Sequence, residues 1–245
     1  LSINASSTNV SSLFSSSYGA DGAGSVSYQV STTDSTDSGL KDTATGQEIF
    51  LFNTANGVEG RVGGVNGAVA FAVTISNGVV TLDQQRALYH SDPNDANDPL
   101  SIGSGKINLV GTVVDGDGDK ASVGVDLGGK LSFLDDAPTI GQGSGNVQLT
   151  VDETHLGTDA SANVTSLFSV NFGADGAASS NSLTYQLTTT NNTDSGLKDT
   201  ATGQNIFLFK EGSNVVGRVG GSGGAVAFTV SLDASGNVTL DQQRA

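Results

Sequence analysis

The stretch Ala68-Val-Ala-Phe-Ala-Val-Thr-Ile75 decides the fold class of this chain. Its larger apolar side chains fall at every second position, which is typical of a β-strand with one buried face. Asn77-Gly78 follows, a pair that favours the hairpin turns that require positive φ. Similar alternating runs lie at 26–30, 107–113 and 123–127, and further Asn-Gly pairs separate strands at 56–57 and 66–67. Short strands at close spacing predict an all-β chain built of β-sandwiches.

The chain also repeats itself with a period of about 155 residues, which is the size of a whole domain. The segment 37–47 returns letter for letter as 194–204, and the pattern 9–14 returns as 163–168. The sequence therefore predicts a first β-sandwich repeat at 1–140, a Gly-rich linker at 141–147 and a second repeat at 148–245. When the two repeats are aligned, the first is expected to lack its N-terminal edge, and the second is expected to lack its C-terminal strands.

Composition excludes several classes of function. The formal net charge of the 245 residues is −15, which argues against nucleic acid or an anionic membrane as partner. The absence of Cys excludes disulfides, thiolate zinc sites and Fe–S clusters. No apolar run approaches the ~20 residues that span a bilayer, so no membrane insertion is expected. Asp outnumbers Glu by 21 to 4, a balance typical of turns and of metal sites with oxygen ligands.

The most specific chemical motif is Asp115-Gly-Asp-Gly-Asp119, which lies between two alternating strands. Its three carboxylates, Asp115, Asp117 and Asp119, are spaced so that their oxygens can converge on a Ca²⁺ ion, which accepts six to eight oxygen ligands. The EF-hand pattern fails, because Lys120 stands where that loop needs Gly. The motif predicts a calcium site on a β-hairpin, and the alternative is a soluble turn.

A second acidic group lies on both sides of the predicted boundary. Asp135 and Asp136 precede it, and Asp152 and Glu153 follow it. If consecutive domains stack end to end, these four side chains are expected to share a Ca²⁺ ion that stiffens the junction. The alternative is a solvated acidic linker.

Two weaker acidic features remain. The loop 90–99 is rich in oxygen ligands and is a lesser candidate for a third calcium site. Asp21 and Asp175 occupy equivalent places in the repeated Gly-Ala-Asp-Gly, where a turn role suits them at least as well as a ligand role.

The sequence offers no catalytic constellation, so the chain is not expected to be an enzyme. His90 and His155 are not equivalent between the repeats and are interpreted as surface residues. Nucleophile-elbow, P-loop and His-Glu-x-x-His motifs are missing. Arg86 and Arg244 recur in the repeated Asp-Gln-Gln-Arg-Ala, and a structural salt bridge to a nearby Asp is favoured over an anion site.

Several of these motifs, taken in order, resemble the tandem repeats of giant bacterial adhesins of the repeats-in-toxin type, which are exported by type I secretion. They are Gly-Ala-Asp-Gly (19–22 and 173–176), Thr81–Ala87, Val114–Asp119, Leu134–Ile140 and Val151-Asp-Glu-Thr154. The resemblance implies tandem Ig-like or cadherin-like sandwiches, stabilised by Ca²⁺, on the extracellular face of a bacterium. Their role would be that of an extender, or stalk, which projects a ligand-binding region for adhesion and biofilm formation. The junction also resembles the calcium linker of cadherins, which implies Asp135, Asp136, Asp152 and Glu153 as its ligands.

Two other functions stay open from the sequence. One is a calcium-dependent module that binds glycans or proteins, although the chain has no Trp to stack on sugar rings. The other is a self-assembling extracellular filament or matrix protein. In that case residues near 88–138 of a neighbouring copy would complete the second repeat by strand addition. The expected partners are therefore neighbouring repeats of the same polypeptide, with other copies as the alternative.

Overall fold

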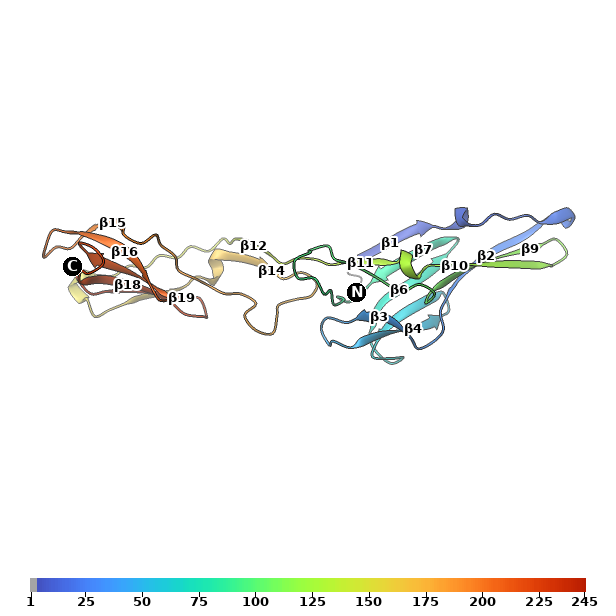
Figure 1. Ribbon diagram of the computed structural model, residues 1–245, viewed down its shortest axis with the longest axis horizontal. Helices are drawn as coiled ribbons and strands as arrows, with labels where there is room; N and C mark the ends of the chain where they lie inside the picture. Colours follow the sequence, from blue (N-terminus) through green and yellow to red (C-terminus); the bar gives the residue numbers. More distant parts are fainter. Residues whose placement is uncertain (1–3) are drawn as a thin grey trace. The chain divides into compact units, whose positions relative to one another are not determined.

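The computed structural model describes residues 4–245 and divides the chain into two compact units (Figure 1). Unit 1 contains Leu1–Pro138 together with Phe172–Gly176, and unit 2 contains Thr139–Asn171 and Ala177–Ala245. Residues 1–3 of the predicted first repeat lie outside the described part. Every strand pair is antiparallel, and the prediction of an all-β chain of sandwich modules is confirmed.

Unit 1 is built on a six-stranded sheet in the order β1-β7-β6-β5-β4-β3. The fold-deciding stretch forms β6, which pairs with β7 across Asn77 and Gly78, both at positive φ. The alternation buries Phe71 and Val73 completely. The strands are β1 (Asn4–Asn9), β3 (Thr36–Lys41), β4 (Glu48–Thr54), β5 (Gly57–Val62), β6 (Val69–Ser76) and β7 (Val79–Gln84).

A second layer covers this sheet. It contains the three-stranded sheet β10-β9-β2 and the pair β11-β8. Ile107, Leu109 and Phe133 from this layer are buried in the same core as Phe71, and the rings of Phe71 and Phe133 lie 5.0 Å apart between centroids. The strands are β2 (Ala23–Ser31), β8 (Pro99–Ser101), β9 (Asn108–Asp115), β10 (Lys120–Asp126) and β11 (Ser132–Leu134).

Unit 2 repeats the first sheet of unit 1, in the order β13-β19-β18-β17-β16-β15. Its buried core cluster is much smaller: Ile206, Val219 and Ala227, with Phe228 packed against them. In the described part of unit 2 the remaining sheet is the pair β12-β14. The strands are β12 (Thr139–Gln142), β13 (Ala160–Asn163), β14 (Phe168–Asn171), β15 (Thr193–Lys198), β16 (Asn205–Glu211), β17 (Asn214–Val219), β18 (Val226–Leu232) and β19 (Asn237–Gln242).

The predicted Gly-rich linker at 141–147 takes part in unit 2. Gly141 and Gln142 belong to β12, which pairs with β14. The backbone N–H of Gly143 donates to Leu167 O (2.8 Å), and that of Gly145 donates to Ser166 O (2.9 Å). Backbone hydrogen bonds therefore hold much of this segment.

Helix occurs in the described residues only as single 3₁₀ turns. They are η1 (Ser11–Leu13), η2 (Gly19–Asp21), η3 (Gly128–Lys130), η4 (Glu153–His155) and η5 (Thr165–Leu167). Within residues 4–245, no helix has the length and apolar character that a bilayer crossing requires.

Candidate metal centres

The Asp-Gly-Asp-Gly-Asp motif forms the turn between β9 and β10. Asp115 ends β9, and its backbone N–H donates to Asp119 O (3.1 Å). Its carboxylate Oδ1 accepts the backbone N–H groups of Gly118 (3.1 Å) and Asp119 (2.8 Å). The carboxylate of Asp115 is thus fixed by its own hairpin.

A second loop, the 3₁₀ turn η2, approaches this hairpin from another part of the sequence. The backbone N–H of Gly116 donates to Gly22 O (3.0 Å). A Cβ atom at position 116 would overlap the backbone oxygen of Asp21, so the approach requires glycine there. This contact brings the Asp21 side chain to the hairpin.

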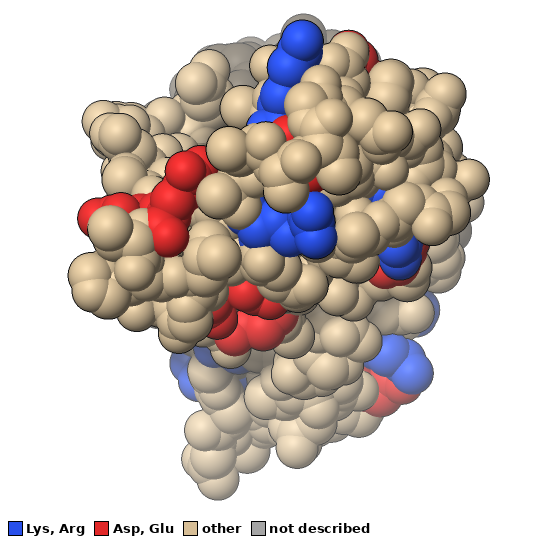
Figure 2. Space-filling model, turned by 90° about the vertical axis from the view of Figure 1, so that its left-hand side faces the viewer, with Lys and Arg blue, Asp and Glu red and all other residues tan. Residues whose placement is uncertain are grey.

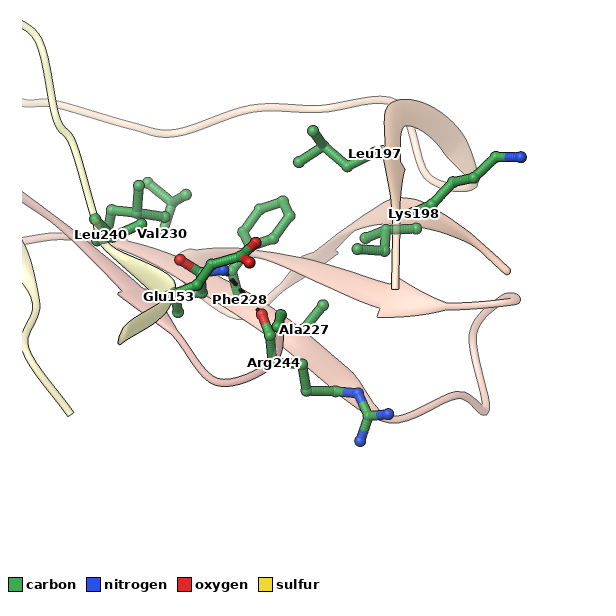
Figure 3. Close-up of a pocket in the computed structure, with 12 residues that line it drawn as sticks. Glu153, Leu197, Lys198, Ala227, Phe228, Val230, Leu240 and Arg244 are labelled. Atoms are coloured by element: carbon green, nitrogen blue, oxygen red, sulfur yellow. Dashed lines mark hydrogen bonds between the residues drawn. The ribbon is translucent and has the colours of Figure 1, made fainter. Parts of the chain in front are cut away.

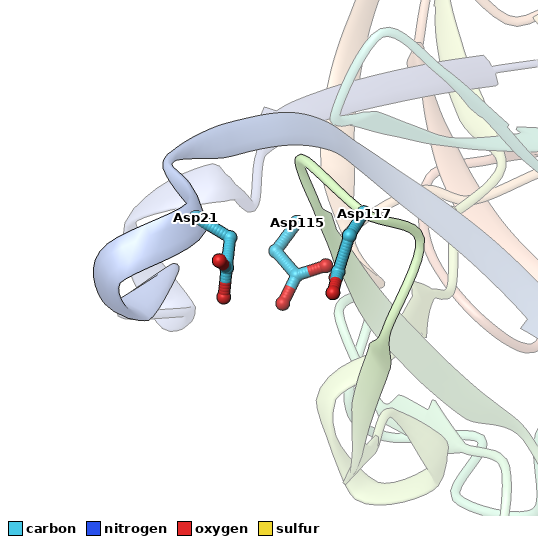
Figure 4. A group of neighbouring side chains, drawn as sticks. All are labelled: Asp21, Asp115 and Asp117. Carbon is cyan, nitrogen blue, oxygen red and sulfur yellow. The ribbon is translucent and has the colours of Figure 1, made fainter.

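Carboxylate oxygens of Asp21, Asp115 and Asp117 lie within 4.8 Å of one another (Figure 4). Hydrogen bonding with Asp117, and then with the backbone N–H groups of Asp119 and Gly118, holds the pKa of Asp115 below its usual value. Asp115 is therefore anionic at neutral pH, and carboxylates that lie this close to it are repelled unless a cation joins them. Asp119, which the sequence placed with Asp115 and Asp117, is not in this group and contributes backbone hydrogen bonds.

The second group in unit 1 contains Asp135, Asp136 and Asp175, again with carboxylate oxygens within 4.8 Å of one another. Asp136 Oδ2 accepts the backbone N–H of Ala174 (2.7 Å), which holds the loop that carries Asp175. Asp135 Oδ1 accepts the backbone N–H of Asp136 (2.9 Å). The three side chains line a hollow of about 280 Å³ together with Leu88 and His90.

Both groups offer only carboxylate oxygens. Oxygen-only donor sets suit hard cations such as Ca²⁺, which tolerates irregular geometry and completes its shell with backbone carbonyls and water. They do not suit zinc or copper, which favour nitrogen or sulfur ligands. The residues present therefore fit calcium.

Asp152 and Glu153, the other predicted ligands, lie in unit 2. Asp152 caps η4 by accepting hydrogen bonds from the backbone N–H of Thr154 (2.9 Å) and from the hydroxyl of Thr154. These bonds lower the pKa of Asp152, and the bond from the hydroxyl has the larger effect. Glu153 lines a pocket beside the unit 2 sheet. Their sharing of an ion with Asp135 and Asp136 stays a prediction.

The third candidate, the loop 90–99, uses its acids locally. Asp92 Oδ1 accepts the N–H of Asn94 (2.9 Å), and Asp95 Oδ1 accepts that of Asn97 (3.0 Å). Hydrogen bonds of this kind are typical of Asx turns.

Asp21 and Asp175, for which the sequence favoured a turn role at least as much as a ligand role, are members of the acidic groups. These two aspartates are the same residue of the repeat, and each lies in one of the two acidic groups. The sequence feature that indicates them is the repeated motif Gly-Ala-Asp-Gly. In the structure, the first and last glycines of this motif have positive φ in both copies. The sequence could not show which distant acids each Asp would meet.

The repeated arginines are structural, as predicted. Arg86 Nε lies 2.7 Å from Asp42 Oδ1, and Arg244 Nε lies 2.7 Å from Asp199 Oδ1. Both aspartate side chains are buried, with 1% exposed. On the face of the molecule in Figure 2, Lys and Arg lie in small patches separated by acidic and uncharged residues.

Comparison with known families adds one match. Residues 2–128 and 148–245 match the family described as Domain of unknown function (DUF5801). The chain belongs to this family. The DUF5801 match takes in both repeats and leaves out 129–147, the stretch that contains Asp135 and Asp136. No protein with a curated description and no solved structure matches the chain.

Proposed function

We propose that this DUF5801 chain is a calcium-stabilised structural extender of a bacterial surface adhesin. In this role its sandwich modules form part of an extracellular stalk that projects a ligand-binding region for adhesion and biofilm formation. Neighbouring repeats of the same polypeptide are its partners, and it performs no catalysis.

One observation carries the proposal: the repeated Asp of Gly-Ala-Asp-Gly lies in both acidic groups. Asp21 lies with Asp115 and Asp117, and Asp175 lies with Asp135 and Asp136. A soluble turn needs no third carboxylate from a distant loop, and that carboxylate adds repulsion unless a cation offsets it. Calcium therefore gives these two convergent arrangements a physical reason.

The energetics suit a module that becomes rigid outside the cell. Extracellular modules bind Ca²⁺ with Kd of roughly 10⁻⁴–10⁻³ M. At a free concentration of about ten times Kd, each site stabilises the folded state by about 1.4 kcal/mol. Two sites contribute about 3 kcal/mol, a large share of the roughly 5–15 kcal/mol of a whole domain.

The test replaces the shared ligand in each group. We expect calcium to raise the melting temperature of the wild-type chain, and Asp21→Asn and Asp175→Asn each to remove about half of that rise. The rise corresponds to roughly 4 °C per site. Differential scanning calorimetry with calcium, magnesium or chelator measures it.

Asp159→Asn is the matched control, because Asp159 is exposed and lies outside both groups. It removes one charge of the same kind and should leave the calcium response unchanged. A melting temperature that chelator does not alter would sink the proposal. A saturable hit on a glycan array would favour the binding module instead.

A further inference from the structure

The apolar face of the unit 2 sheet is open, although the same face in unit 1 is closed. Leu40 in β3 is 3% exposed, whereas its equivalent in β15, Leu197, is 54% exposed. Phe71 is fully buried, whereas its equivalent Phe228 is only partly buried. Because the two sheets have the same strand order, the difference lies in what covers them.

The open face borders a groove of about 430 Å³, which Figure 3 shows with Leu197, Phe228 and Val230 around it. All residues that line the groove belong to unit 2. Most of them are apolar, so water in the groove is in contact with a surface that gains stability when it is covered.

The backbone beside this face is also without a partner strand. Residues 184–190 are the equivalents of 27–33, which are the second half of β2 and the two residues after it. Side chains at 183, 185 and 187 alternate half-buried with exposed neighbours. In unit 1, β2 pairs with β9 from Ala23 to Ser31. Among the described residues no strand pairs with 184–190. An extended segment whose backbone is not paired to another strand accepts a further strand.

Unit 1 shows which residues cover the apolar sheet face and which strand pairs with β2. Residues 88–134 supply β9, which pairs with β2, and they bury a row of apolar side chains against the sheet. These are Leu88, Ile102, Ile107, Leu109, Leu127, Leu131 and Phe133, none more than 7% exposed. Phe133 covers Phe71, the equivalent of the open Phe228.

We propose that the open face of unit 2 binds a polypeptide segment with the apolar pattern of residues 88–134. A strand of the β9 type adds to 184–190, and apolar side chains of the same segment cover Leu197 and Phe228. This inference is independent of calcium and of the proposed stalk function. It defines a β-completion site, with peptide backbone and alternating apolar side chains as the ligand chemistry.

The ligand is a free segment, not the engaged segment of an intact second copy. In an intact copy, residues 88–134 already cover the sheet of unit 1. Donating them would open one face in order to close another, with no net gain in buried area. A segment that is not yet engaged carries no such cost.

The test adds a synthetic polypeptide of residues 88–134 to the full 245-residue chain. We expect saturable binding at one segment per chain by isothermal titration calorimetry. In hydrogen exchange, amides of 184–190 should exchange rapidly without the segment and be protected with it. That readout separates strand addition from non-specific adhesion of apolar surfaces.

Two matched pairs of variants locate the contact. In the chain, Leu197→Asp should weaken binding at least tenfold, while Ser222→Asp, an exposed change in the same unit, should not. Since Leu197 is already exposed, its replacement leaves unit 2 folded. In the segment, Leu109→Asp should abolish binding, while Asn94→Asp adds the same charge in an exposed loop and should be silent.

Three outcomes would overturn the proposal. The first is no binding at a segment concentration of about 100 μM. The second is equal affinity of the wild-type chain and Leu197→Asp. The third is a wild-type dimer in sedimentation that Leu197→Asp dissociates and the segment does not, which would mean that two open faces cover each other.

Discussion

Asp42 and Asp199 show at the scale of single residues how a buried carboxylate is kept charged. Each accepts hydrogen bonds from Nε and Nη2 of one arginine and from one threonine hydroxyl. Burial raises the pKa of Asp42, but the hydrogen bonds from Arg86 and Thr45 outweigh it and leave that pKa below its usual value. The hydrogen bond from Arg244, followed by that from Thr202, lowers the pKa of Asp199 to about 2.

These shifts predict how stability depends on pH. A carboxylate whose pKa is lower in the folded state stabilises the fold fully above its unfolded pKa of roughly 3.9, and the effect is lost as pH falls. We therefore expect Asp199→Asn to melt below the wild type by a constant amount above about pH 4. The difference should shrink toward zero near pH 2, as thermal melts by circular dichroism would show.

The exposed variant Asp159→Asn serves again as control and should track the wild type at every pH. If the deficit of Asp199→Asn were as large at pH 2 as at pH 7, the carboxylate would be acting through packing, not charge.

At the scale of elements, the alternating pattern predicted the interior strands β6 and β9 and also the edge strands β2 and β10. Residues 68–75 predicted β6 directly, because the larger side chains at alternate positions include Phe71 and Val73, which are fully buried. The short strand β12 escaped prediction, since all four of its residues are exposed and carry no alternation. Residues 184–190 also alternate between half-buried and exposed side chains, but they have no partner strand among the described residues. The pattern there indicates a segment that can form a strand when another strand pairs with it.

The candidate metal ligands also fall into those that the sequence predicted and those that it did not. The spacing in Asp115-Gly-Asp-Gly-Asp119 predicted that Asp115 and Asp117 lie together, because a two-residue spacing is a local property of the turn. Asp21 and Asp175 join the two groups through contacts between segments far apart in sequence. Such contacts depend on how whole loops pack, and the sequence alone showed only that the Asp repeats.

Gly60 and Gly217 lie at equivalent positions of β5 and β17, and each lies against a phenylalanine ring. A Cβ at Gly60 would overlap the ring of Phe71, and one at Gly217 would overlap that of Phe228. Phe71 is fully buried, whereas Phe228 lines the open groove and has room to shift. We expect Gly60→Ala to destabilise unit 1 by about 2 kcal/mol through overpacking, and Gly217→Ala to cost less than about 1 kcal/mol.

The loss of stability in each variant is measured by chemical denaturation, with hydrogen exchange as the probe of unfolding in each unit. Gly124→Ala is the control, because a Cβ there meets no neighbouring atom within 4 Å. Equal costs at positions 60 and 217 would mean that Phe228 is held as firmly as Phe71, contrary to an open face.

At the scale of the whole molecule, the two units carry the same sheet with different support. Unit 1 has a large buried core between two layers, and both acidic groups belong to it, with Asp175 entering through Phe172–Gly176. Unit 2 has a small core and an open face. Because hydrophobic burial dominates folding free energy, unit 2 should be the less stable unit.

We therefore expect two calorimetric transitions that respond to different ligands. Calcium should raise the upper transition, which belongs to unit 1, by roughly 4 °C per site and leave the lower one in place. The segment 88–134 should raise the lower transition alone, because it binds the open face of unit 2. If calcium instead raised the lower transition, and Asp152→Asn removed that effect, an ion held partly by Asp152 and Glu153 would be stabilising unit 2. A single transition that moves with both ligands would mean that the units unfold together, and that the stability of each depends on the other.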